Sequence, residues 1–113
     1  MIKEEKLHKI RETISKYAKA KAERVYLTEF RKSKKAILMK KYEVEGHKTV
    51  SAQEREALSD SEYIEILKGL RDAVEIEEDI RWNLVILQQD LEQKKAETYQ
   101  HTAEMKMQGG VDI

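Results

Sequence analysis

The side chains best suited to metal or acid–base chemistry are few and lie on highly charged stretches. Glu97 and His101 are four residues apart, the spacing that places two ligands on one face of a helix. That spacing arises by chance in a chain with 39% charged residues. The carboxylates of residues 75–79 suit acid–base catalysis or cation binding, but such a run on a long helix is usually a solvated surface. We therefore predict no metal site, no cofactor and no catalytic residue.

The sequence also lacks the motifs around which common active sites are built. It has no glycine-rich nucleotide-binding loop, no metalloprotease helix motif and no nucleophile elbow. It has no cysteine, which removes disulfides and thiol nucleophiles. No apolar stretch is long enough to span a membrane, and the first residues have no signal-peptide pattern. We expect a non-enzymatic, cytoplasmic chain with no membrane partner.

Cations are concentrated between Lys21 and Lys41 and share one side of a helix. At 100° per residue, five of them fall within an arc of roughly 100°: Lys21, Arg24, Arg31, Lys32 and Lys35. A stripe of this kind binds phosphates by counterion release. Tyr17 and Tyr42 lie near its two ends, where their rings can stack on bases. We predict that the stripe binds single-stranded nucleic acid, with single-stranded DNA as the expected partner.

The distribution of charge along the chain supports a second interpretation of these cations. Residues 1–50 contain 15 Lys and Arg against 7 Asp and Glu, residues 51–113 contain 7 against 15, and the net charge is zero. Either one half has an anionic partner, or the two halves pair with each other as antiparallel helices. The alternative function is a helical adaptor or inhibitor that binds a host or phage protein without nucleic acid, with the basic and acidic halves as its interaction surfaces.

Composition favours an all-α fold. Proline is absent, and good helix formers dominate the chain before Gly46, which is suited to end a helix in the left-handed conformation. Ser51–Glu54 and Ser59–Glu62 both have the form of a capping box. We predict a long antiparallel helical hairpin with a short connecting helix. The predicted helices are about 2–44, 52–58 and 61–107, in a single domain over 1–108, followed by a frayed tail at 109–113.

Hydrophobic periodicity divides the first helix into two parts. One apolar face is formed by residues 7–17, and a second by Tyr26, Leu27, Phe30, Ile37 and Leu38; the two faces point about 180° apart. Either the helix is interrupted near residues 19–23, or its halves pack against different neighbours; the alanines there favour the second. The last helix has a heptad-like seam that Glu77 interrupts. Its apolar members are Tyr63, Ile66, Leu70, Ala73, Ile80, Leu84, Leu87 and Leu91.

One short stretch of the last helix is apolar on nearly every side. Residues 82–87 contain a single polar side chain, that of Asn83. Because a helix that is apolar all round must be covered all round, we predict that the chain assembles into an oligomer. The residues predicted to form the core and the oligomer contacts are Tyr26, Phe30, Ile37, Trp82, Leu84, Ile86 and Leu87.

Three stretches carry a resemblance to known proteins. Ala20–Lys40, Ala52–Ala57 and the helix through Trp82 resemble small helical proteins of tailed bacteriophages. The layout, a basic helical first half, a linker and a long helix with a tryptophan, is similar to that of phage recombination mediators. This resemblance implies a ring-like oligomer in the host cytoplasm that binds single-stranded DNA and contacts a recombination or replication protein. The acidic second half and the zero net charge depart from that pattern.

Overall fold

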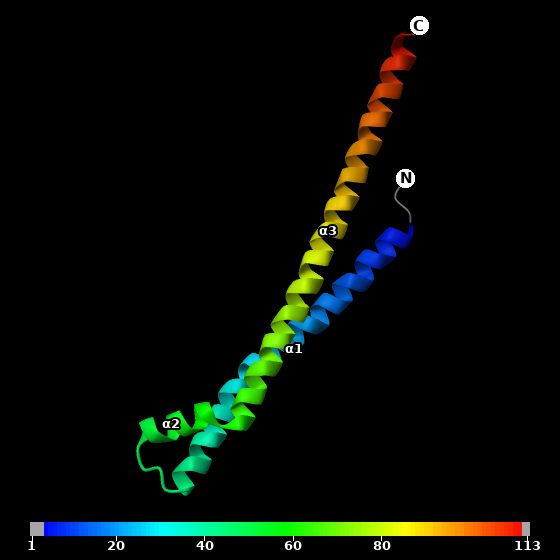
Figure 1. Ribbon diagram of the computed structural model, residues 1–113. Helices are drawn as coiled ribbons and strands as arrows, with labels where there is room; N and C mark the ends of the chain where they lie inside the picture. Colours follow the sequence, from blue (N-terminus) through cyan, green and yellow to red (C-terminus); the bar gives the residue numbers. More distant parts are fainter. Residues whose placement is uncertain (1–3, 112–113) are drawn as a thin grey trace. The chain divides into compact units, whose positions relative to one another are not determined.

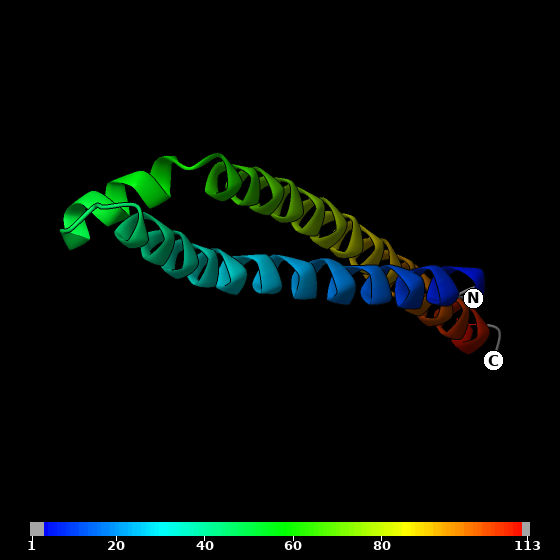
Figure 2. The ribbon, with the colours of Figure 1, turned by 90° about the horizontal axis from the view of Figure 1, so that it is seen from below.

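The computed structural model describes residues 4–111, and these residues form three α-helices with no strand. Helix α1 spans Glu4–Val44, α2 spans Val50–Ser59 and α3 spans Ser61–Val111 (Figure 1). Figure 2 shows that the short α2 connects the end of α1 with the start of α3. The all-α prediction is therefore confirmed for the described part of the chain.

The connection before α2 differs from the predicted one in its capping residue. Gly46 has φ +112°, as predicted for the residue that ends α1. Helix α2 begins at Val50, because Thr49 has an extended backbone and its hydroxyl accepts a hydrogen bond from the Ala52 N–H at 3.1 Å. The predicted cap at Ser51 thus lies two residues too late, inside the helix.

The start of α3 is also fixed by a neighbour of the predicted residue. Asp60 accepts a hydrogen bond from the Glu62 N–H through Oδ1 at 2.8 Å, whereas the Ser59 hydroxyl donates back to the Arg55 carbonyl at 2.9 Å. Asp60 is therefore the N-cap that the sequence predicts at Ser59. At its other end α3 reaches Val111, beyond the predicted end at 107. The last two residues of the predicted tail lie outside the described part.

Helix α1 is continuous through residues 19–23, where the sequence left an interruption open. The chain nevertheless divides into two compact units, and the division falls inside α1 and α3. Unit 1 comprises Met1–Tyr17 and Asp79–Ile113, and unit 2 comprises Ala18–Glu78. The sequence predicts a single domain, and the boundary between the two units within α1 falls near the predicted change of apolar face. The halves belong to different packing environments, as the alanine-rich sequence favoured.

Unit 2 contains a small, well-covered core. Leu38 on α1, Ala57 on α2 and Tyr63 on α3 are buried together, and Met39 packs against them. Ala73 is buried further along α3, where the predicted seam continues. Glu77 occupies the next seam position and is buried as well. The interruption predicted in the seam is therefore a carboxylate inside the packed face.

Unit 1 covers its apolar side chains less completely. The seam residues Ile80, Leu84, Leu87 and Leu91 are half-buried, which confirms the predicted face. Among the described residues of this unit only Thr13 is buried, and its hydroxyl donates to the Lys9 carbonyl at 2.8 Å. Every residue from Glu92 to Met107 is exposed. The last third of α3 is thus a helix with no packed face in the described structure.

Candidate functional site

Two of the five cations predicted to bind nucleic acid form ion pairs with another helix of unit 2. Arg24 makes a bidentate contact with Glu77, with Nε–Oε2 at 2.6 Å and Nη2–Oε1 at 3.1 Å. Lys35 reaches Glu54 on α2, with Nζ–Oε1 at 2.9 Å. Because these cations are directed toward α3 and α2, the structure does not present the five as one open stripe.

The other three predicted contacts remain on the outside of α1 or at its edge. Lys21 is exposed, and Lys32 pairs only with Glu29 one turn away at 3.3 Å. Arg31 is half-buried. These three side chains make no ion pair with α2 or α3 within residues 4–111.

Two further lysines of α1, which the prediction did not include, also pair across unit 2. Lys34 contacts Glu62 at 3.0 Å and Lys41 contacts Asp60 at 3.8 Å. The α1 part of this unit, residues 18–44, contains nine cations and three acids, and residues 45–78 contain four and ten. The positive charge of α1 is therefore balanced within unit 2.

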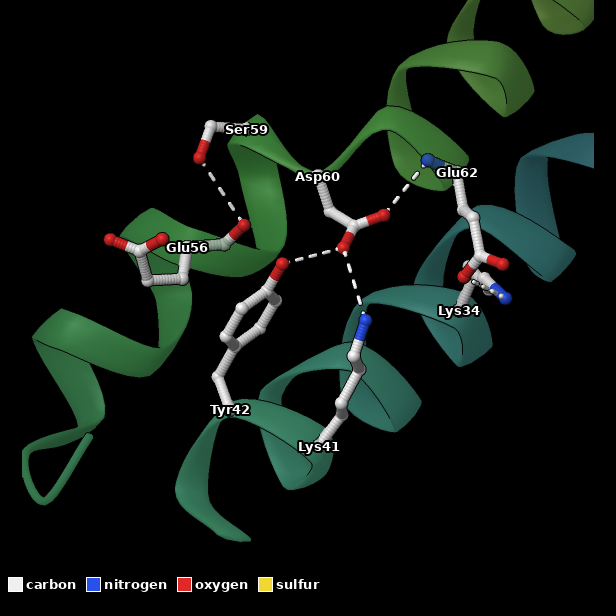
Figure 3. Close-up of polar contacts among 7 residues, drawn as sticks. All are labelled: Lys34, Lys41, Tyr42, Glu56, Ser59, Asp60 and Glu62. Atoms are coloured by element: carbon white, nitrogen blue, oxygen red, sulfur yellow. Dashed lines mark hydrogen bonds and ion pairs between the residues drawn. The ribbon is translucent and has the colours of Figure 1, made fainter. Parts of the chain in front are cut away.

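Asp60 is the centre of a polar cluster where α1 meets the α2–α3 junction (Figure 3). Its Oδ2 accepts a hydrogen bond of 2.6 Å from the Tyr42 hydroxyl, while its Oδ1 caps α3. The side chains of Tyr42 and Lys41 both point toward this carboxylate from α1. The Tyr42 hydroxyl therefore forms a hydrogen bond within the chain, whereas the sequence analysis assigned its ring to stacking on bases.

This cluster shifts the pKa values of two of its members. The hydrogen bond to Asp60 raises the pKa of the Tyr42 hydroxyl to about 12, because the neighbouring carboxylate disfavours a phenolate. The same hydrogen bond, helped by the Glu62 N–H and by Lys41, lowers the pKa of Asp60. Both shifts favour a neutral tyrosine bonded to an ionised aspartate, an arrangement that fixes the junction at neutral pH.

The apolar face predicted on the second half of α1 is turned to solvent in part: its members Leu38 and Leu27 are buried and half-buried, and the others are exposed. Tyr26 and Ile37 are each 59% exposed, Phe30 is exposed to a lesser degree, and Val44 continues the same line. The Tyr26 and Phe30 rings stack with centroids 5.8 Å apart. The sequence placed this face against the protein and the cations outside; in the structure the side near Arg24 and Lys35 packs inward. Leu38 supplies the buried contact there.

The apolar patch of α3 is divided between a covered and an open side. Leu84 and Leu87 lie on the half-buried seam, whereas Trp82 is 54% exposed and Ile86 61% exposed. The guanidinium of Arg81 lies 4.6 Å from the centre of the Trp82 ring. Of the four predicted core residues in this patch, Leu84 and Leu87 are therefore half-buried, and Trp82 and Ile86 form an exposed apolar surface.

Unit 1 also contains a groove of about 310 Å³ between its two helical segments. Ile10, Leu87 and Leu91 provide its apolar wall, and Lys6 contacts Asp90 at 3.1 Å along its edge. Within residues 4–111, no group of three His, Asp or Glu side chains is arranged to hold a metal ion. No helix there is both long and apolar enough to cross a membrane.

Comparison with family models, with curated proteins and with solved structures gave no match. Two features of these surfaces were missed by the sequence analysis. Val44 belongs to the exposed face of α1, and its spacing of seven residues from Ile37, which itself follows Phe30 by seven, is the signal that identifies it. The pairing of Arg24 with Glu77 has no local signal, because the partners are 53 residues apart.

Proposed function

We propose that this chain is a non-enzymatic helical adaptor or inhibitor that binds another protein. The observation that carries the proposal is the exposure of Trp82 and Ile86 on α3, more than half in each case. Exposed apolar patches mark interaction sites, and tryptophan and arginine dominate the binding energy of many protein interfaces. Trp82, Ile86 and Arg81 form a surface onto which an amphipathic partner helix would dock.

The charge balance supports a protein partner over a polyanion. Both units have a net charge of zero, and four cations of α1 are paired across unit 2. A polyanion gains affinity from positive charge that is not neutralised within the protein. In this chain much of the positive charge of α1 is already neutralised by acidic residues of unit 2.

We further infer that the helices form an antiparallel hairpin and that the chain self-associates. Ion pairs between α1 and α3 support the hairpin, because in unit 2 the later α1 residue pairs with the earlier α3 residue, as antiparallel helices require. These pairs are Arg24–Glu77 and Lys34–Glu62 in unit 2, and Lys6–Asp90 in unit 1. Self-association is supported by the large apolar side chains that remain exposed on α1 and α3.

A photo-crosslinking amino acid at position 82 tests the adaptor proposal in the cells that produce the chain. We expect a crosslinked protein that is absent when the same group is placed at Gln88, an exposed position about 120° around α3. Replacing Ile86 with Ser should reduce the yield from position 82, because it removes the adjacent apolar contact. Equal crosslinking from positions 82 and 88 would contradict the proposal.

A second candidate function is binding of single-stranded nucleic acid. It is favoured by the three predicted stripe cations that make no ion pair to α2 or α3 in the described structure, namely Lys21, Arg31 and Lys32. If each contacts one phosphate, the logarithm of the binding constant should fall against the logarithm of salt concentration with a slope of about −2. Fluorescence anisotropy with single-stranded DNA at about 50 and 200 mM salt measures this slope. Absence of binding at the lower salt concentration would exclude this candidate.

We also propose a setting for the chain, among accessory proteins of phage replication or recombination in the host cytoplasm. This placement is supported by the resemblance of Ala20–Lys40 and of the overall layout. A recombinase-loading assay with and without the chain tests it, and an unchanged loading rate would contradict it.

A further inference from the structure

The exposed side of α1 in unit 2 carries a complete heptad seam. Its positions follow each other at strictly alternating spacings of four and three residues and lie within an arc of roughly 100°. Its members, all exposed, are Lys19, Glu23, Tyr26, Phe30, Ser33, Ile37, Lys40 and Val44. Leu38, through which α1 packs on α2 and α3, lies outside the seam, about 100° around the helix from Ile37. An uncovered seam of this length has the pattern of a two-helix interface.

We propose that a second copy of this chain covers the seam, with the two α1 helices antiparallel. This inference rests on the self-association proposed above and specifies its surface, direction and register. In a parallel pair, each seam residue faces the same residue of the other copy. Lys19, Glu23 and Lys40 would then each meet a like charge in the centre of the interface, which disfavours that direction.

One antiparallel register matches charge and side-chain size at three of the four kinds of layer in the seam, and in the outermost layers it places Lys19 opposite Val44 of the second copy. In this register Glu23 faces Lys40 of the second copy, and by symmetry this pairing occurs twice. Tyr26 faces Ile37 of the second copy, so aromatic and aliphatic side chains meet in the same layer. Phe30 faces Ser33 of the second copy, and a large side chain thereby lies opposite a small one, as interdigitated packing requires.

The registers one heptad away in either direction are disfavoured by the residues that flank the seam. In one of them Glu29 faces Glu29 of the second copy. In the other, Lys34 faces Lys34 and Glu29 faces Glu43. In the proposed register these flanking positions bring Leu27 beside Lys34 and Glu29 beside Ala36, with no pair of like charges. The charges of α1 therefore select a single arrangement among the neighbouring alternatives.

Charge reversal tests the register by sedimentation equilibrium. E23K and K40E should each weaken the dimer about tenfold, since each creates two like-charge contacts by symmetry. The double variant E23K/K40E restores the ion pairs with reversed sign and should return the dissociation constant to within about threefold of the original. E75K, a charge reversal at an exposed α3 position outside the seam, is the matched control and should leave the dimer unchanged.

Disulfide trapping tests the direction, because the chain has no cysteine of its own. Under mild oxidation, a mixture of Y26C and I37C chains should give a mixed disulfide-linked dimer, and Y26C alone should give little. Efficient linking of Y26C to itself would overturn the antiparallel arrangement. If E23K and K40E leave the dissociation constant of the dimer unchanged, the proposed register is wrong, whereas the proposal of self-association is not contradicted. A chain that sediments as a monomer at every concentration would overturn both, leaving the seam for a helix of a different protein.

Discussion

Units 1 and 2 are built from the same two helices but differ in what holds their helical segments together. The buried apolar residues of the described chain, Leu38, Ala57, Tyr63 and Ala73, all belong to unit 2. Unit 2 also has the bidentate contact between Arg24 and Glu77. Unit 1 has half-buried leucines and isoleucines, with the exposed ion pair between Lys6 and Asp90.

The difference between the units follows from the number of helices available to cover each seam. In unit 2 the short α2 supplies a third helix, and its Ala57 has no exposed surface because α1 and α3 both cover it. In unit 1 only two helical segments are present, and two helices leave each with one covered stripe. Unit 2 is therefore the part of the chain with a fully buried core, although both units also leave large apolar side chains exposed.

The largest expected effect comes from the core of unit 2. L38A removes most of a side chain that is 1% exposed, and we expect a loss of about 2–5 kcal/mol in the free energy of unfolding. Chemical denaturation followed by circular dichroism measures this loss. L58A, at a partly exposed position on α2, should cost far less. If both variants lose the same stability, the core has been placed wrongly.

The buried carboxylate of unit 2 should give the next largest effect. E77A leaves Arg24 without this partner, and we expect a loss of about 2 kcal/mol, below the full cost of a buried pair because Arg24 is about one-third exposed. Replacing both residues, with R24M and E77L, continues the apolar seam and should recover most of that stability. A double variant less stable than E77A would show that the pair is required for more than charge neutrality.

The Tyr42–Asp60 contact makes the stability of unit 2 depend on pH at both extremes. The lowered pKa of Asp60 contributes stability that is present above its unfolded pKa near 3.8 and lost as pH falls through the folded value. The raised pKa of Tyr42 contributes stability that is complete below pH 10 and lost as pH rises toward 12. Y42F should therefore raise the pH of acid unfolding and flatten the alkaline loss. Melting temperatures of both proteins across pH 3–12 provide the measurement, and parallel pH profiles would contradict the prediction.

The smallest effect should come from unit 1. D90N removes the ion pair between Lys6 and Asp90, whose side chains are 35% and 48% exposed, and we expect little or no change in the free energy of unfolding. The same denaturation experiment measures it. A loss comparable to that of E77A would mean that unit 1 depends on this pair as strongly as unit 2 depends on its own.

The helices and the covered face of α3 could be predicted because they depend on local information. Absence of proline, the position of Gly46 and the spacing from Tyr63 to Leu91 are readable within a few turns. The caps were displaced to Thr49 and Asp60 because several neighbouring residues are suitable caps, and backbone geometry decides among them.

The side of α1 that packs on α2 and α3 could not be predicted from local information, because the composition of either side is compatible with packing inward. The side with Tyr26 and Phe30 is more apolar, and the hydrophobic pattern alone favours burying it. The inward side, which lies between Leu38 at the edge of the predicted face and Arg24 on the predicted stripe, was selected by contacts distant in sequence, namely Leu38 with Tyr63 and Arg24 with Glu77. Because this side packs inward, two cations of the candidate nucleic-acid stripe, Arg24 and Lys35, form ion pairs within the chain.

The position of Trp82 gives the molecule an intrinsic optical probe. It is the only tryptophan in the sequence, and it belongs to unit 1 and is more than half exposed. Its emission should be red-shifted in the free chain and should move to the blue when a partner covers the indole. The same signal follows the melting of unit 1 alone, whereas circular dichroism averages over every helix. Coincidence of the two melting curves would mean that the units unfold as one cooperative body, and an earlier fluorescence transition would mean that they unfold in sequence.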